Sequence, residues 1–278
     1  MRNPTATVAW IALSSLLPEP VAAPQTIDLY VHVDVARVRA QGLIAASAGD
    51  AEAEEAVMKL VRWRLDVADV TAKVSAEDGT VSVALPAEAK SEQKAASTVL
   101  GGLYGCEFFL EARDEDVDGE GGLALEYGRF QAWRAANPDR PWLDYNADPE
   151  RSERRLAWLP TRWQDDEGPP MPVLLPTEAA EAFTSNDFES VEPAKDALDY
   201  PAVSFTLRPE RTEDFETFTE DATGRRMAIA LAGTVRSAPT LNGKLSGSGI
   251  IEGHFDEDEM DEILAILRSH EGALTTDR

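Results

Sequence analysis

Apolar and polar residues alternate near the start of the chain, with apolar side chains at positions 27, 29, 31, 33 and 35. A period of two predicts a β-strand over 27–35 with one buried face. From 51 to 65 the apolar positions change to a helical spacing, and a second helical pattern, rich in alanine, covers 89–103. We therefore predict one strand followed by two helices that flank an intervening segment.

The segment between these helices predicts a β-hairpin. Alternating runs at 70–74 and 81–85 flank Glu77-Asp78-Gly79, a sequence typical of a tight turn. A last apolar run, 107–112, is predicted as a strand that closes the sheet. The order β-α-β-β-α-β is that of a ferredoxin-like fold, whose helices lie on one face of an antiparallel sheet. The predicted fold class is therefore α+β, with a ferredoxin-like βαββαβ base over 27–112.

The last third of the chain, 171–275, predicts a second α+β subdomain. Its expected elements are a strand at 203–207, a helix at 210–221, strands at 227–231 and 250–251, and a helix at 257–269. Pro209 suits the first turn of a helix, where a missing backbone N–H costs nothing. The strand 227–231 ends at Ala232-Gly233, where we predict the turn of a hairpin.

Residues 113–170 differ from both flanks because they are rich in charge, proline and tryptophan. The tryptophans stand at 133, 142, 158 and 163, and one helix is predicted at 123–136. Disordered segments are poor in aromatic residues. We therefore expect an irregular Trp-rich excursion that docks through its aromatic side chains.

The N-terminus has the layout of a secretory signal peptide. Arg2 precedes the apolar stretch Val8–Leu17, and Val21-Ala22-Ala23 offers small residues for cleavage. The apolar stretch is about half of the roughly 20 residues that a membrane span needs. We predict a signal peptide over 1–23 and a periplasmic or secreted protein. The alternative is an apolar tail, so membrane association is expected at most through an uncleaved N-terminal segment.

The chain carries 51 acidic and 26 basic residues, a formal net charge of −25. An acidic excess of this size repels nucleic acid and favours basic partners. We therefore exclude nucleic-acid binding. The single cysteine, Cys106, excludes an internal disulfide, and its apolar neighbours predict a buried, inert thiol.

No catalytic motif stands out. The three histidines are His32, His254 and His270, and the sequence contains no G-x-S-x-G elbow, no H-E-x-x-H and no phosphate-binding glycine loop. Carboxylates are so frequent that their proximity in sequence carries no information. We expect no enzymatic activity and no cofactor.

One acidic run has the spacing of a calcium loop. Asp114, Asp116 and Asp118 are followed by Gly119, which matches the D-x-D-x-D-G opening that surrounds a hard cation with oxygen atoms. The twelfth position of such a loop requires an acid, and Leu125 stands there. A calcium site and a solvated acidic loop therefore remain as alternatives.

An ordered series of motifs occupies the last third of the chain. It reads PAVSF at 201–205, FT at 218–219, GRRMAIALAGTVRSAP at 224–239, IEGHF at 251–255 and LRS at 267–269, with GAL at 272–274. This series resembles the first periplasmic domain of SecD, the accessory subunit of the bacterial protein-export translocase. Weaker matches in the family's order lie within 27–112, and the Trp-rich segment is unmatched.

The resemblance implies a ferredoxin-like base at 27–112 and a head subdomain at 171–275. It implies a non-enzymatic role in protein export, with unfolded or emerging polypeptide or translocase components as partners. The family's D-L-x-G-G motif is missing after Ile27, and Ala232 stands where the family usually has an acid. The family's membrane helices are also absent, so we expect an exported domain without its proton-driven transport.

The resemblance assigns the stretch 224–239 to scaffold and contact surface. We therefore expect a binding surface that contains Arg225, Arg226, Arg236, Phe205 and Phe215. The alternative, from a different class, is a secreted calcium-dependent structural or adhesion protein that has reused the fold.

Overall fold

The computed structural model describes residues 26–40, 43–44, 47–101, 103, 105–117, 121–162, 170–178, 180–253, 255–268 and 274–276. The predicted signal peptide at 1–23 lies outside these residues, as do Asp118, Trp163, His254 and His270. Within the described ranges, no helix combines the length and the apolar character that a membrane span requires.

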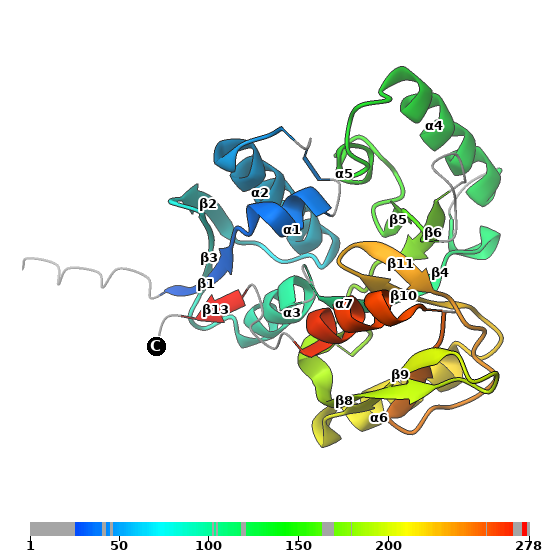
Figure 1. Cartoon of the computed structure of the whole chain (residues 1–278). Coiled ribbons are helices and arrows are strands. Elements are labelled where there is room, and N and C mark those ends of the chain that lie inside the picture. Colours follow the sequence, from blue (N-terminus) through cyan, green and yellow to red (C-terminus); the bar gives the residue numbers. More distant parts are fainter. Residues whose placement is uncertain are drawn as a thin grey trace, which may run out of the picture.

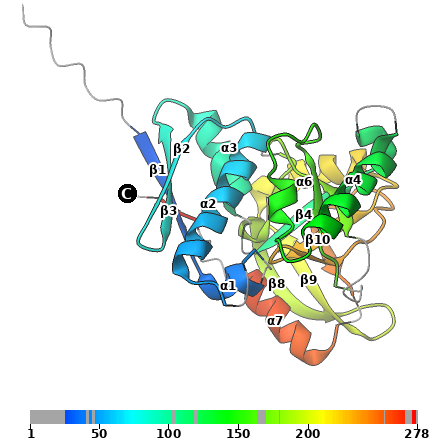
Figure 2. The ribbon, with the colours of Figure 1, turned by 90° about the horizontal axis from the view of Figure 1, so that it is seen from above.

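The first sheet is antiparallel and has the strand order β13-β1-β3-β2 (Figure 1). Its strands are β1 (Thr26–His32), β2 (Lys73–Glu77), β3 (Thr80–Pro86) and β13 (Leu274–Thr276), and its helices are α1 (Val35–Ala40), α2 (Asp50–Val67) and α3 (Lys90–Gly101). Figure 2 shows α2 and α3 on the same side of this sheet, between it and the rest of the molecule. Alternate residues such as Leu29, Val31 and Val83 are buried, as the period of two predicts.

The prediction that 107–112 closes this sheet is wrong. β4 (Cys106–Glu111) instead lies inside a second sheet, paired with β10 (Met227–Leu231). Its first four residues are all buried, so both faces of the strand need cover, which a position in the middle of the molecule provides. β13 takes the place beside β1. The strand predicted to run to position 35 also ends early, because α1 begins at Val35.

Two further sheets build the rest of the molecule. The second has the order β11-β10-β4-β6-β5, with β7 also paired to β4, and the third has the order β12-β9-β8. Their remaining strands are β5 (Leu156–Leu159), β6 (Met171–Leu174), β7 (Phe183–Thr184), β8 (Phe188–Lys195), β9 (Pro201–Leu207), β11 (Thr234–Ser237) and β12 (Ser248–Ile251). The remaining helices are α4 (Gly122–Ala136), α5 (Leu143–Asn146), α6 (Pro209–Asp221) and α7 (Glu257–Arg268), with short 3₁₀ turns η1 (Asp114–Asp116) and η2 (Ser185–Asp187).

A core rich in phenylalanine joins the second sheet to the third. The ring of Phe108 in β4 lies 5.5 Å from that of Phe205 and 6.0 Å from those of Phe188 and Phe215, measured between centroids. Leu267 of α7 is completely buried against the same cluster. Aromatic rings at these distances stabilise a core beyond the area that they bury.

The Trp-rich segment builds a separate core of its own against β5. Phe130 of α4 lies 5.3 Å from Trp158 and 5.2 Å from Tyr145 between ring centroids, and all three side chains are buried. Glu126 sits beneath them and accepts hydrogen bonds from the Tyr145 hydroxyl at 3.0 Å and from Arg151 at 2.7 Å. The segment is therefore more regular than predicted, because its aromatic side chains pack on one another, and the predicted helix is α4.

The hairpin predicted at Ala232-Gly233 is confirmed. β10 and β11 pair there, with Leu231 opposite Thr234, and φ is 48° at Ala232 and 77° at Gly233. Two successive positive φ angles match the twist of the flanking strands. Because Ala232 has a Cβ atom, this conformation costs about 1 kcal/mol.

Candidate functional site

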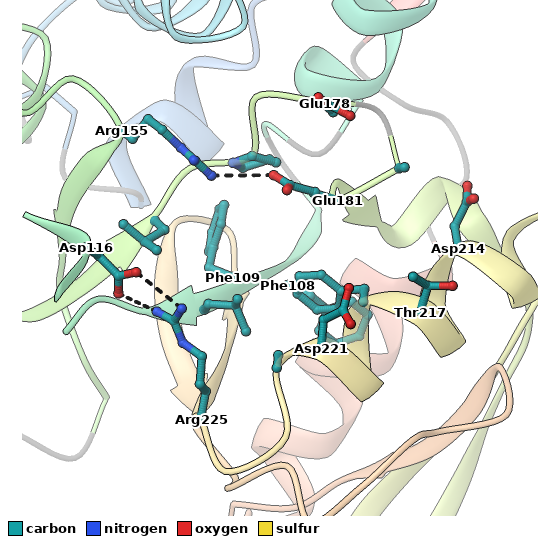
Figure 3. Close-up of a pocket in the computed structure, with 16 residues that line it drawn as sticks. Phe108, Phe109, Asp116, Arg155, Glu178, Glu181, Asp214, Thr217, Asp221 and Arg225 are labelled. Atoms are coloured by element: carbon teal, nitrogen blue, oxygen red, sulfur yellow. Dashed lines mark hydrogen bonds and ion pairs between the residues drawn. The ribbon is translucent and has the colours of Figure 1, made fainter.

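A cleft of about 510 Å³ opens beside β4, between α6 and the segment that links β6 to β7. Figure 3 shows Phe108 and Phe109 of β4 along its inner wall, with the carboxylates of α6 on one side. Both phenylalanines are almost completely buried. The apolar surface that a ligand can reach therefore comes mainly from the half-buried side chains of Leu110, Leu174 and Phe218.

Acidic groups dominate the rim of the cleft, where five carboxylates and two guanidinium groups line the space. Asp214 and Asp221 project from the same face of α6, because seven residues correspond to two helical turns. Glu178 and Glu181 come from the segment between β6 and β7. This surplus of negative charge favours cationic groups at the rim.

Two ion pairs connect the walls of the cleft (Figure 3). Arg225 Nη2 lies 2.5 Å from Asp116 Oδ2, with both side chains 17% exposed, and also donates to the Glu111 carbonyl at 2.8 Å. Arg155 and Glu181 are 3.4 Å apart and about half exposed, so their pair contributes little.

The remaining carboxylates of the rim differ in their partners. Asp214 pairs with Arg211. Glu178 and Asp221 are exposed and form no ion pair with any described residue. These two groups therefore remain available to a cationic ligand.

The prediction that Phe205 and Phe215 belong to a binding surface is wrong, because both side chains lie in the core. Their side chains are 3% and 0% exposed. β9 and α6 turn their apolar faces toward Phe108, so these rings fill the space between the second and third sheets.

The three predicted cations reach the surface, but each lies near a carboxylate. Arg225 lines the cleft and pairs with Asp116, while Arg226 Nη1 lies 3.0 Å from Glu111 Oε1. Arg236 Nη1 is 4.0 Å from Glu259 Oε1. They therefore do not present a positive patch.

The predicted calcium loop shows other contacts for two of its three aspartates. Asp114 Oδ1 accepts a hydrogen bond from the backbone of Leu123 at 3.1 Å, and Asp116 pairs with Arg225. Among the described residues, no cluster of three or more His, Cys, Asp or Glu side chains could hold a metal ion. Because Asp118 lies outside those residues, calcium binding stays a prediction.

Cys106 is completely buried, as predicted. Burial, with a further effect of the neighbouring Glu107, raises the pKa of its thiol well above the usual value. A thiol that stays protonated is a poor nucleophile and metal ligand, so Cys106 is a packing residue.

Of the five carboxylates that line the cleft, only Asp116 is among the predicted site residues, where it is predicted as a calcium ligand; the other four are not among them. A helical signal for them exists, because positions 214, 217, 218 and 221 share one face of α6 and all four line the cleft. The opposite wall of the cleft is contributed by residues that only folding brings close to α6, namely Leu174, Pro176, Glu178, Ala180 and Glu181.

Residues 160–276 match the family model described as the P1 head subdomain of SecDF. The predicted resemblance to the first periplasmic domain of SecD is confirmed. The match covers α6, the hairpin at Ala232-Gly233 and the final helix, and it begins within the predicted Trp-rich segment.

Three relatives show how much of SecD this chain represents. The protein translocase subunit SecD of Aquifex aeolicus is 39% identical over 92 residues, which are 33% of this chain and 18% of the relative. SecD of Leptotrichia buccalis is 32% identical over 131 residues, 46% of this chain and 30% of its own. SecDF of Thermus thermophilus is 33% identical over 106 residues, 38% of this chain and 13% of its own. The chain thus spans less than a third of the length of these relatives.

Solved structures of SecDF cover more of the chain at lower identity. SecDF in a super-membrane-facing form matches 91% of this chain at 22% identity, with a TM-score of 0.35. A structure of a membrane component SecDF that enhances protein export matches the same share at 22% identity, with 98% of its own chain covered and a TM-score of 0.36. The predicted α+β fold class is confirmed by the helices and sheets described above.

Proposed function

We propose that this chain acts in protein export as a non-catalytic binding domain for unfolded or emerging polypeptide. Segments that contain both apolar and basic side chains bind in the cleft beside β4. The observation that carries this proposal is the combination of accessible apolar surface with the carboxylates of Glu178 and Asp221, which form no ion pair within the described part of the chain. The likeness to SecD supports the export role, a location outside the cytoplasm, and translocase components as further partners.

The geometry suits short-lived binding of many sequences. An apolar side chain of the polypeptide contacts Leu110, Leu174 and Phe218, and a neighbouring lysine or arginine reaches Asp221 or Glu178. Exposed ion pairs are weak and are screened by salt. The affinity is therefore modest and falls as ionic strength rises, which allows the polypeptide to leave again.

Fluorescence anisotropy with labelled peptides tests this function. We expect a peptide of alternating leucine and lysine to bind, and Asp221→Lys to weaken that binding about fivefold, because one attraction becomes a repulsion. Asp261→Lys is the matched control, since it makes the same charge change on the exposed side of α7, outside the cleft. Equal affinity for this peptide and for its leucine–glutamate counterpart would contradict the proposal.

A further inference from the structure

β12 lies at the edge of the third sheet, so one of its sides pairs with β9 and the other pairs with no strand in the described part of the chain. The backbone N–H of Leu207 donates to the carbonyl of Gly247 at 2.7 Å. Hydrogen-bonded pairs alternate along an antiparallel ladder. The backbone groups of Ser248 and Ile250 therefore point away from β9, toward the open side.

Four other edge strands each have a carbonyl group that accepts a hydrogen bond from outside their sheet. Arg62 donates to Val74 of β2, Arg151 to Leu156 of β5, Arg268 to Val191 of β8, and the backbone of Arg162 to Val235 of β11. Such contacts remove the acceptors that an additional strand would use. β8 also contains Pro193, which has no N–H to offer.

β12 has none of these protections. Its sequence is Ser-Gly-Ile-Ile, without a charge or a proline, and no hydrogen bond from a described side chain reaches it. Ile250 is 47% exposed, which makes it one of few large apolar side chains on the described surface. An open edge beside an exposed apolar residue is the arrangement that pairs with an added strand.

We infer that the open edge of β12 binds an extended polypeptide segment, which adds to the third sheet as a fourth strand. This inference rests on the proposed function and names a second contact for the same class of partner. Main-chain hydrogen bonds hold any extended sequence, which suits a partner whose sequence varies. Ile250 favours an apolar residue beside it in the added strand.

The charge of the chain argues for a basic polypeptide segment and against a second copy of this protein. A second copy would bring another net charge of −25 to the edge, and like charges oppose association. A segment with lysine or arginine meets no such opposition. Glu252, which is exposed directly after β12, adds a local attraction for such a segment.

The test uses a labelled peptide of about ten residues with alternating valine and lysine, long enough to form a strand. Ile250→Pro removes one outward N–H and leaves the pairs with β9 in place. We expect it to lower the affinity about tenfold, while Ile250→Thr, which keeps the N–H, changes it less than about threefold. The same peptide with methylated amide nitrogens on one edge loses binding to the unmodified protein.

The outcomes separate this inference from the proposed function. Equal affinity of the Ile250→Pro and unmodified proteins would overturn β12 as the contact, while weaker binding to Asp221→Lys would still support the cleft. If sedimentation shows a dimer of the unmodified protein that Ile250→Pro abolishes, the inference is also overturned, because the edge of β12 then binds a second copy of the chain. Should Ile250→Pro not fold, hydrogen exchange of the unmodified protein decides: the peptide must slow exchange at Ser248 and Ile250, and unchanged rates refute the added strand.

Discussion

Arg64 of α2 and Glu107 of β4 form an ion pair inside the protein. Arg64 Nη2 lies 2.9 Å from Glu107 Oε2, and both side chains are less than one-tenth exposed. The rings of Trp63 and Phe109 lie 5.3 Å and 5.5 Å from the Arg64 guanidinium carbon. The pair therefore joins a helix that covers the first sheet to a strand inside the second.

Removing one member of this pair should destabilise the protein strongly. Arg64→Ala leaves the carboxylate of Glu107 buried without a partner, and we expect the free energy of unfolding to fall by about 3–5 kcal/mol. Urea denaturation measures the loss. The double replacement Arg64→Met with Glu107→Leu is the control, because two apolar side chains restore a neutral core and should recover most of the stability. A loss below about 1 kcal/mol for Arg64→Ala would show that the pair is not buried in solution.

The same pair should make stability depend on pH. Burial raises the pKa of Glu107 and outweighs the opposing charge and hydrogen bond of Arg64. The folded protein then holds this proton more tightly than the unfolded chain does. The free energy of unfolding therefore falls as pH rises from the ordinary glutamate pKa through the raised one. Relative to Glu107→Gln, the unmodified protein should lose stability over that window and stay constant above it; a gain there would contradict the raised pKa.

The turn of the β10–β11 hairpin offers a stabilising substitution. Ala232 has a φ of 48°, a conformation that asparagine adopts more readily than alanine. We expect Ala232→Asn to raise the free energy of unfolding by about 0.5–1 kcal/mol. Gly233→Ala is the opposite control, since φ at Gly233 is 77° and a Cβ atom there should cost a similar amount. Thermal unfolding of both variants checks the prediction, and a melting temperature lowered by Ala232→Asn would contradict it.

A substitution at Asp116 distinguishes two roles of the loop at Asp114–Asp116, an ion pair with Arg225 and a calcium site. Asp116 and Arg225 form an ion pair in which each side chain is 17% exposed, and Asp116→Asn weakens this contact. We therefore expect the free energy of unfolding to fall by about 1–2 kcal/mol, both with a calcium chelator and with added calcium. Calorimetric titration with calcium measures the alternative directly. Uptake of calcium that Asp118→Asn abolishes, with stability that rises on binding, would instead support the calcium loop.

Much of the secondary structure follows from local patterns. The periods of two and 3.6 residues locate β1, β3, α2, α4, α6 and α7, because the side that a residue presents to the core depends only on its place within its own element. Gly233, after an apolar run, likewise marks the turn of the hairpin. Local patterns do not predict β13, because its three residues are too few to show a period.

The pairing of strands does not follow from local patterns, because it depends on contacts between segments that are far apart in the chain. β4 carries the apolar pattern of a buried strand, which fits either the first sheet or the second, and only the position of β10 settles the choice. Phe205 and Phe215 show the same limit. Their spacing marks an apolar face, but the packing around Phe108 makes that face a core instead of a binding surface.

The sequence by itself determined the α+β composition, the main helices, the buried thiol, the acidic character and the likeness to SecD, because each is written in local patterns or ordered motifs. Only the tertiary structure decided the site. With 51 acidic residues in the chain, sequence proximity cannot select the few carboxylates that matter. Folding brings α6 against the segment that follows β6 and places Asp221 and Glu178 beside an apolar wall, where neither pairs with a cation of the described residues. It also leaves β12 at an open edge, since hydrogen-bond partners of a strand are chosen in space and not along the chain.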